Sequence, residues 1–578
     1  MSPPARHPAQ PTVSPAVWTQ GQTVVHAPGA RVLALDIGTS GARAVLFDLS
    51  GIMQGSAYQE YKSTFITPTF IDHNPATWLE TVHALIPGVI KETGTQPHDV
   101  IAISVTSQRA TIVPVDERGQ WLAPAISWQD KRSLEVCAEL AQTVDEEALF
   151  QTSGLRMDPY FSLPKVLWIR RHAPDVFRQT FKFLTVHDLV VHHLTGVFAT
   201  DYTQASRTMM FDIRTLTWNA PLLNSLGLDE ELLPEAYQTG TIAGGLTHEA
   251  AERLGLSAGT PVVMAGGDQQ CATVGLGVIR PGLATVTTGT GSFVVAPVSR
   301  PVFDAKKRVL CSVAAVPNQW ILEAGIFSTG AVYRWVRDEI ADEVRAKAEA
   351  VGADPYVLLD GLATRVRPGS GGVLWLPHFA GSAAPYWNPD ARGVIFNLTL
   401  GHSKDQLIRA ALEGIVLEVN KNLAIIRELL SFANPLANPL TAPLTDPTKP
   451  AALDEIRVTG GAVRSDLFNQ IQADVYGRRV IPAEIEEATA LGAAVIGATA
   501  VGVYPDIEAA CDAMSRLNTE RSAEPDVERS AIYQELGRLH DLVYQALDGA
   551  GVYRLAEEIS QKLAGQDESM MSTFGLQV

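Results

Sequence analysis

The sequence predicts an α/β protein built from two large, related lobes, and three observations lead to this fold class. The chain has 578 residues, which is too long for a single hydrophobic core and favours two domains. Stretches with strand-like and helix-like patterns alternate along it, as in α/β proteins. A short hairpin rich in glycine and hydroxyl residues occurs twice, around residue 38 and again around residue 290, which indicates two related halves.

The first half supplies the strands of this prediction in a clear order. Residues 32–36 are an apolar run ending in an aspartate, and a turn at 38–41 separates them from a second apolar run at 44–47. The segments 99–105 and 261–264 are continuous apolar runs of the kind that form buried strands. The sequence therefore predicts a strand–turn–strand unit followed by further strands of the same sheet.

The second half supplies the clearest helices. Ser403 followed by Gln406 is a capping-box pattern, and it predicts the start of a long helix. Apolar residues at helical spacing mark one face of that helix: Ile408, Leu412, Ile415, Val419, Leu423, Ile426 and Leu430. Ser465 predicts the start of a helix that ends at Gly477. The small residues from 488 to 494 predict a helix that packs closely against a neighbour.

Composition narrows the possible partners and location. There are 63 acidic and 45 basic residues, for a net charge of -18, which argues against nucleic-acid or anionic-membrane partners. The four cysteines are scattered without a CxxC pair, as expected of reduced thiols in the cytoplasm. No apolar run is long enough to cross a membrane. The first 30 residues favour a disordered extension, and we expect a cytoplasmic protein.

The two hairpins are candidate phosphate-binding loops. Glycine and hydroxyl residues let backbone N–H groups approach a polyphosphate closely, and a neighbouring aspartate such as Asp36 could hold Mg²⁺. A turn-forming aspartate at a strand end explains Asp36 equally well. The chain has no Gly-Lys dipeptide and therefore no P-loop, and it lacks the protein-kinase motifs.

Two later segments are further candidates. Gly460 and Gly461 follow a predicted strand, where a glycine pair admits a flat ring or a phosphate but also suits a tight turn. Asp268 follows a buried strand and could take a proton from a substrate hydroxyl. Taken alone, that segment favours an aspartate that caps the following helix.

Over residues 31–545, the ordered motifs resemble the FGGY family of carbohydrate kinases, and several are closest to glycerol kinases. The stretches that carry the resemblance are 106–109, 127–130, 158–162, 200–208, 267–270, 289–293 and 384–387. The resemblance implies an actin-like ATPase (ribonuclease H-like) fold, with two duplicated domains and an active-site cleft between them. It also implies an ATP-dependent kinase that uses Mg²⁺ and phosphorylates a hydroxyl group of a small polyol or sugar.

The family pattern assigns a role to each matching residue. Asp268 would be the general base, and Asp36 would organise Mg²⁺. The substrate would lie among Arg109, Trp128, Tyr160, Asp268, Gln269 and Phe293. ATP would be held by Gly38, Thr39, Ser40 and Arg43 in the first hairpin, by Thr290 and Gly291 in the second, and by Gly460, Gly461 and Arg464 near the adenine.

One position departs from the glycerol kinases. They carry a glutamate after the Gln-Arg pair, where this chain has Ala110. Loss of that hydrogen-bond acceptor should cost about 1–3 kcal/mol of glycerol affinity, or it could leave room for a larger acceptor. The resemblance therefore implies glycerol or a related polyol, with a ketopentose such as xylulose or ribulose, or autoinducer-2, as alternatives.

The resemblance also sets the expected domain plan and the competing classes of function. We expect an extension at 1–30, a domain for sugar and phosphate at 31–280, a nucleotide domain at 281–548 with a Pro-rich insertion at 434–450, and a C-terminal tail at 549–578. Dimers are widespread in the family, so a homodimer is one expectation. A non-catalytic sugar sensor would be expected to lose Asp36 or Asp268, and both are present. A chaperone-like ATPase would need a peptide-binding module, and a regulator would need a helix-turn-helix.

Overall fold

The structure is a computed structural model that describes residues 23–67, 69–433 and 453–574. The Pro-rich insertion expected at 434–450 and most of the extension expected at 1–30 lie outside the described residues. The chain divides into two compact units. The first contains the described residues up to Pro281 together with Pro297–Leu322 and Glu487–Arg516, and the second contains Gly282–Ala296, Glu323–Glu486 and the chain from Leu517 onward.

The sheet of the first unit has the strand order β14-β15-β6-β1-β2-β3. These strands are β1 (Arg31–Ile37), β2 (Gly41–Asp48), β3 (Met53–Glu60), β6 (Val100–Ser107), β14 (Ile242–Gly245) and β15 (Pro261–Gly267). Strand β1 pairs antiparallel with β2 and parallel with β6, and β6 pairs parallel with β15. The four strands predicted from the first half of the sequence are therefore confirmed.

The sheet of the second unit repeats this pattern. Its strands run in the order β18-β19-β17-β16-β22-β23, with β18 (Leu310–Val313) as the edge strand beside β19. The other five strands repeat the first unit. They are β16 (Leu283–Thr288), β17 (Ser292–Val298), β19 (Trp320–Ile326), β22 (Glu455–Thr459) and β23 (Arg479–Pro482). Strand β16 pairs antiparallel with β17 and parallel with β22, and β22 pairs parallel with β23. The order of these five strands matches β3-β2-β1-β6-β15 of the first unit, so the duplication inferred from the two hairpins is confirmed.

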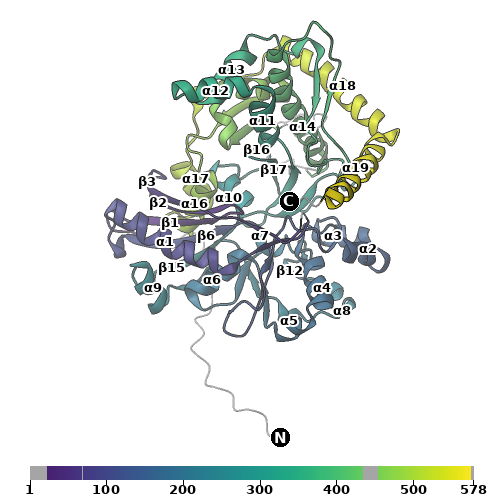
Figure 1. Cartoon of the computed structure of the whole chain (residues 1–578). Helices are drawn as coiled ribbons and strands as arrows, with labels where there is room; N and C mark the ends of the chain where they lie inside the picture. The colour runs from purple at the N-terminus through teal and green to yellow at the C-terminus, as the bar shows by residue number, and fades with distance from the viewer. Residues whose placement is uncertain (1–22, 68, 434–452, 575–578) are drawn as a thin grey trace. The chain divides into compact units, whose positions relative to one another are not determined.

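Helices cover both faces of the first sheet (Figure 1). On one face lie α1 (Pro75–Thr93), α6 (Val186–Thr195) and α9 (His248–Leu254), whose apolar residues share one buried core with the strands. On the other lie α10 (Asp268–Gly275) and α16 (Ala488–Ala500). Gly492 of α16 lies against the backbone of α10, which confirms the close packing predicted for this helix. This packing explains why Glu487–Arg516 belongs to the first unit rather than to a continuous second domain.

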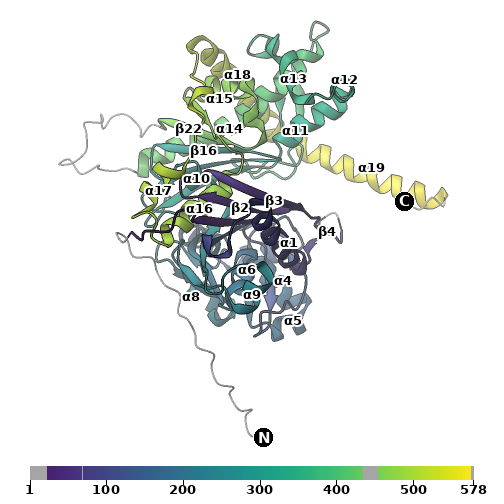
Figure 2. The ribbon, with the colours of Figure 1, turned by 90° about the vertical axis from the view of Figure 1, so that its left-hand side faces the viewer.

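Two helices of the second unit, α14 (Lys404–Ala433) and α15 (Asp466–Tyr476), were predicted from the sequence and are labelled in Figure 2. Helix α14 starts after Ser403, whose N–H donates to Oε1 of Gln406 at 2.8 Å, so the predicted long helix is confirmed. Helix α15 has Ser465 as its N-cap and Gly477 as its C-cap, again as predicted. It packs against α18 (Val527–Gly549).

The rest of the chain forms shorter elements and a terminal helix. In the first unit the remaining helices are α2 (Leu134–Thr143), α3 (Glu146–Ser153), α4 (Ser162–His172), α5 (Pro174–Gln179), α7 (Tyr202–Ala205), α8 (Ala220–Ser225) and α17 (Ile507–Met514). In the second they are α11 (Gly330–Trp335), α12 (Asp342–Val351), α13 (Pro355–Thr364) and α19 (Val552–Phe574). Most of the tail expected at 549–578 is thus the helix α19. Among the described residues, no helix is long and apolar enough to cross a membrane.

In the part of the chain that the structure describes, short strands outside the two large sheets form one three-stranded and four two-stranded sheets. They are β4 (Thr64–Phe65) with β5 (Ile71–His73) and β8 (Ala125–Ile126), β7 (Val113–Val115) with β9 (Lys182–Leu184), β10 (Ala199–Asp201) with β13 (Glu235–Tyr237), β11 (Phe211–Asp212) with β12 (Thr217–Trp218), and β20 (Leu374–Leu376) with β21 (Val394–Phe396).

Candidate active site

The first candidate loop is the turn between β1 and β2. Asp36 lies near the end of β1 and is paired in register with Arg43 of β2. The N–H of Gly38 donates to the carbonyl of Gly41 at 3.0 Å and closes the turn, which leaves Ser40 exposed. Nη1 of Arg43 lies 3.0 Å from Oε1 of Glu487. The structure therefore brings the predicted metal residue and the predicted phosphate loop to the same end of the sheet.

The electrostatics of Asp36 show which other groups share this end of the sheet. Burial raises the pKa of Asp36 to about 7, and the negative charges of Asp268 and Glu487 act in the same direction, while Arg43 opposes them. A carboxyl group in this surrounding is stabilised in its charged form by a cation. Asp36 near the end of β1 and Asp268 directly after β15 thus belong to one electrostatic site.

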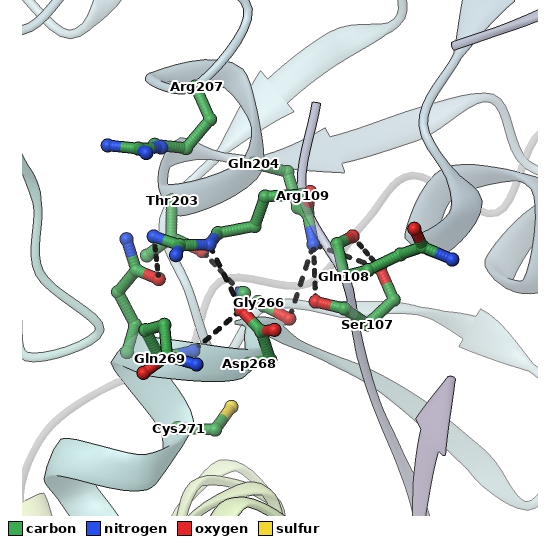
Figure 3. Close-up of polar contacts among 12 residues, drawn as sticks. Ser107, Gln108, Arg109, Thr203, Gln204, Arg207, Gly266, Asp268, Gln269 and Cys271 are labelled. Atoms are coloured by element: carbon green, nitrogen blue, oxygen red, sulfur yellow. Dashed lines mark hydrogen bonds and ion pairs between the residues drawn. The ribbon is translucent and has the colours of Figure 1, made fainter. Parts of the chain in front are cut away.

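Asp268 is held by a buried arginine (Figure 3). It is the first residue of α10, and Gly267 is the N-cap, so the simpler prediction of a helix-capping aspartate is wrong. Nε of Arg109 lies 3.0 Å from Oδ1 of Asp268, and the side chain of Arg109 is 2% exposed while that of Asp268 is 29% exposed. The N–H of Gln269 donates to the same carboxylate oxygen at 2.8 Å. The carboxylate is therefore oriented by two donors and still reaches solvent.

A glycine makes this arrangement possible. A Cβ atom on Gly267 would lie 2.5 Å from Cδ of Arg109 and 2.7 Å from Oε1 of Gln270. Both neighbours are buried, and Nη1 of Arg109 donates to Oε1 of Gln270 at 3.3 Å, so neither has room to move aside. The residue before Asp268 must be small because Arg109 passes directly over its backbone.

The predicted acceptor-binding residues on the first unit fall into two groups, Trp128 with Tyr160 and Arg109 with Asp268 and Gln269. The rings of Trp128 and Tyr160 have centroids 5.1 Å apart, and both side chains are half-buried. Oε1 of Gln269 is buried and accepts no hydrogen bond from any described residue. A buried carbonyl oxygen without a donor is unfavourable, and a hydroxyl group of a bound ligand would supply that donor.

Two buried cations near Tyr160 received no role from the sequence. Nζ of Lys165 donates to the carbonyls of Pro159, Tyr160 and Phe161 at 2.8, 2.6 and 3.0 Å. The guanidinium of Arg207 lies 5.7 Å from the ring centroid of Tyr160. In the sequence, each of these two residues is a basic residue among residues that are otherwise buried. That pattern marks the position as unusual but does not reveal which groups Lys165 or Arg207 contacts.

The remaining predicted residues lie on the second unit. Thr290 and Gly291 form the exposed turn between β16 and β17, and Phe293 is on β17. Gly460 has φ 94°, and a Cβ atom there would lie 2.3 Å from the carbonyl oxygen of Thr288. The glycine pair at 460–461 therefore lies against the base of the second hairpin. Arg464 is exposed and forms an ion pair with Glu486.

The donor set around Asp36 suits a hard cation. Among the described residues there is no group of three or more histidine, cysteine, aspartate or glutamate side chains placed to hold a metal. Mg²⁺ normally uses one or two carboxylates and completes its shell with water and phosphate oxygens. The mutual repulsion of Asp36, Asp268 and Glu487 is relieved by such an ion, so the residues fit Mg²⁺ bound mainly through Asp36.

Comparison with known proteins gives consistent matches to both units. The model described as "FGGY family of carbohydrate kinases, N-terminal domain" matches residues 31–275, and its C-terminal counterpart matches residues 284–501. A glycerol kinase of Janthinobacterium sp. is 33% identical over 529 residues, which cover 89% of this chain and 98% of that protein.

Solved structures give the same fold. A xylulose kinase from Rhodospirillum rubrum superposes with a TM-score of 0.79 at 26% identity and covers 90% of this chain and 99% of its own. Plasmodium falciparum glycerol kinase with ADP has a TM-score of 0.77 at 21% identity and covers 90% and 98%. The expected actin-like ATPase fold with two sheet-containing domains is confirmed.

Proposed function

The chain belongs to the FGGY family of carbohydrate kinases, and from this premise we propose that it transfers the terminal phosphoryl group of ATP to a hydroxyl group of glycerol or a related small polyol. The family makes it a phosphotransferase that acts on an alcohol group. The observation that carries the proposal is the partly exposed carboxylate of Asp268, held 3.0 Å from the buried Arg109 and in the field of Asp36.

Asp268 acts as the general base in this proposal. A carboxylate oxygen that is accessible and oriented can accept the proton of the attacking hydroxyl as the oxygen–phosphorus bond forms. Arg109 keeps the carboxylate in position through its Nε–H, and the amide N–H of Gln269 does the same from the helix. Oε1 of Gln269, which lacks a protein donor among the described residues, accepts a hydrogen bond from a substrate hydroxyl.

Phosphoryl transfer also requires neutralisation of the phosphate charge. Asp36 would hold Mg²⁺, which when bound offsets the negative charge of the phosphate oxygens. In the first unit Gly38 closes the turn through its own N–H, and the turn presents the backbone N–H groups of Thr39 and Ser40 to phosphates. In the second unit the turn of Thr290 and Gly291 presents them in the same way.

The acceptor is argued from the residues that surround it. The resemblance to glycerol kinases implies that Arg109, Trp128, Tyr160 and Gln269 surround the acceptor, and relatives at about one-third identity are named glycerol kinases. Ala110 is the exception, because its methyl group cannot accept a hydrogen bond. A ketopentose or autoinducer-2 is therefore the second candidate, and the similarity to solved xylulose kinases agrees with it. A non-catalytic sugar sensor would not need Asp36 and Asp268.

ADP release with Mg-ATP tests the proposal across glycerol, erythritol, xylulose, ribulose and an autoinducer-2 precursor. The matched variant is Asp268→Asn, which keeps the shape and both hydrogen bonds but removes the basic charge. We expect one strongly preferred acceptor and a loss of about 10²- to 10⁴-fold in kcat for the variant, with ATP binding retained. Undiminished transfer by the variant would refute the assignment of the base, and background rates with every acceptor would favour the sensor.

The expected surroundings of the enzyme belong to the same proposal. We keep the prediction of a cytoplasmic protein without nucleic-acid or membrane partners, which rests on composition. We also keep the homodimer as one expectation, because dimers are widespread in the family. Light scattering of the purified full chain measures the oligomeric state directly.

A further inference from the structure

A closed hydrogen-bond network joins the first phosphate hairpin to the acceptor-lining tryptophan. Nε1 of Trp128 donates to Oγ1 of Thr39 at 2.8 Å, and the backbone N–H of Trp128 donates to Oγ1 of Thr111 at 3.1 Å. Both hydroxyls then donate to Oε1 of Gln108, at 3.4 Å from Thr39 and 3.0 Å from Thr111. Nε2 of Gln108 donates to the carbonyl of Gly38 at 3.0 Å.

Every polar group of this network has a defined task. A hydroxyl group can donate one hydrogen bond. The hydroxyls of Thr39 and Thr111 each donate theirs to Gln108, and each accepts one hydrogen bond from Trp128. The amide oxygen of Gln108 has two lone pairs, and both are occupied. The carbonyl of Gly38 also accepts from Oη of Tyr61 at 2.6 Å. No alternative pairing of these groups satisfies the same set of bonds, so the side chains hold one another in a single arrangement.

Burial makes the arrangement stiff. Gln108 is 2% exposed and Thr111 is 0% exposed, and breaking a buried hydrogen bond leaves an unsatisfied group without water to replace it. The main chain of Gln108 is fixed as well, because its N–H donates to the carbonyl of Ile37 at 2.9 Å. The next residue is Arg109, which holds Asp268. The network therefore touches the hairpin, the tryptophan and the residue that orients the general base.

We propose that Thr39, Gln108 and Trp128 form a relay that couples acceptor binding to ATP binding, with Thr39 and Gln108 as positioning residues. This inference rests on the proposed function. An acceptor that packs against the ring of Trp128 restrains that ring, and the indole N–H passes the restraint to the hydroxyl of Thr39. Gln108 transmits the same restraint to the carbonyl of Gly38, so an occupied acceptor site holds the hairpin in its phosphate-binding shape.

The relay has two consequences that can be measured. Each ligand should bind more tightly when the other is present, because coupling between two sites is reciprocal. ATP hydrolysis without an acceptor should be slow in the wild type, since an acceptor packed against Trp128 adds to the restraint that the network places on the hairpin.

The test is a double-mutant cycle with Thr39→Val, which removes the hydroxyl at constant shape, and Trp128→Phe, which removes the indole N–H but keeps an aromatic ring. Calorimetry gives the Kd of a non-hydrolysable ATP analogue with Mg²⁺, with and without a saturating concentration of the acceptor that the wild type phosphorylates best. The ratio of the two Kd values is the coupling factor, which is typically about 5 to 150 in coupled proteins. Thr499→Val is the matched control, because its buried hydroxyl bonds only within helix α16.

We expect the coupling factor to fall to near 1 in Thr39→Val, in Trp128→Phe and in the double variant, and to stay at the wild-type value in Thr499→Val. Gln108→Glu gives an independent reading if Thr39→Val folds poorly, because it replaces the donor to Gly38 by an acceptor of equal size. A wild-type factor retained by Thr39→Val, or losses that multiply in the double variant, would overturn the relay. If the wild type phosphorylates an acceptor but its coupling factor is 1, the relay is overturned and the proposed function stands. If the wild type is inactive on every acceptor, the proposed function is overturned and the relay with it.

Discussion

Replacement of Gly267 by alanine should damage catalysis through a single methyl group. Gly267 has φ -77° and ψ 149°, which any residue can adopt, so the substitution strains no backbone torsion. The added Cβ atom would lie 2.5 Å from Cδ and 2.9 Å from Cγ of Arg109. Carbon atoms in contact are normally about 3.5–4.0 Å apart. Arg109 must therefore move by about 1 Å or more.

The size of the effect follows from what Arg109 does. It is 3% exposed, bonded to the buried Gln270 and paired with Asp268, so a shift of Arg109 also disturbs the group that orients the carboxylate. A displacement of about 1 Å in a catalytic geometry can cost about 100-fold in rate. Overpacking a buried site typically costs about 1–3 kcal/mol of stability. We expect kcat/KM to fall about 100-fold in a protein that still folds.

Steady-state ADP release and thermal unfolding measure the two effects separately. Gly88→Ala is the control, because Gly88 is an exposed residue of α1 with no atom within 4 Å of an added Cβ. That variant should keep wild-type kinetics and gain up to about 1 kcal/mol in stability from the better helix propensity of alanine. Wild-type kcat/KM in a folded Gly267→Ala protein would refute the claim that Arg109 is held in place by this close approach.

Three further results are expected. Ala110→Glu restores a hydrogen-bond acceptor and should lower KM for glycerol about ten- to a hundredfold, and an unchanged KM would indicate an acceptor other than glycerol. Burial lowers the pKa of Lys165 to about 7 from 10.5, so the unfolded chain binds more protons than the folded protein between these values, and the free energy of unfolding should rise with pH there. Between pH 7 and pH 9 the rise is at most about 3 kcal/mol, and urea denaturation at these two pH values should show it in the wild type and not in Lys165→Met. Tyr533→Phe removes a buried 2.8 Å hydrogen bond to Glu413 and should lower the free energy of unfolding by about 1–3 kcal/mol without changing kcat, and a stability equal to the wild type would contradict this.

Local patterns in the sequence were enough to predict several elements of the fold. The strands around Asp36, the capping of α14 at Ser403 and the limits of α15 at Ser465 and Gly477 depend on residues a few positions apart, so they can be read along the chain. The two hairpins indicated the duplication for the same reason, because each is a local motif. The ordered motifs also identified the family, because so many matches in the same order over most of the chain would not arise by chance.

Only the tertiary structure decided how distant residues act on one another. The segment around Asp268 favoured a helix cap, and the fold instead placed Arg109 beside its carboxylate from another strand. Thr39 joins Gln108 to Trp128 through hydrogen bonds that span 69 and 89 positions of sequence, and no local pattern encodes them. The buried contacts of Lys165 were equally invisible. Secondary structure follows from short-range periodicity, whereas the site is made by contacts between segments far apart in the sequence, which exist only once the sheet has formed.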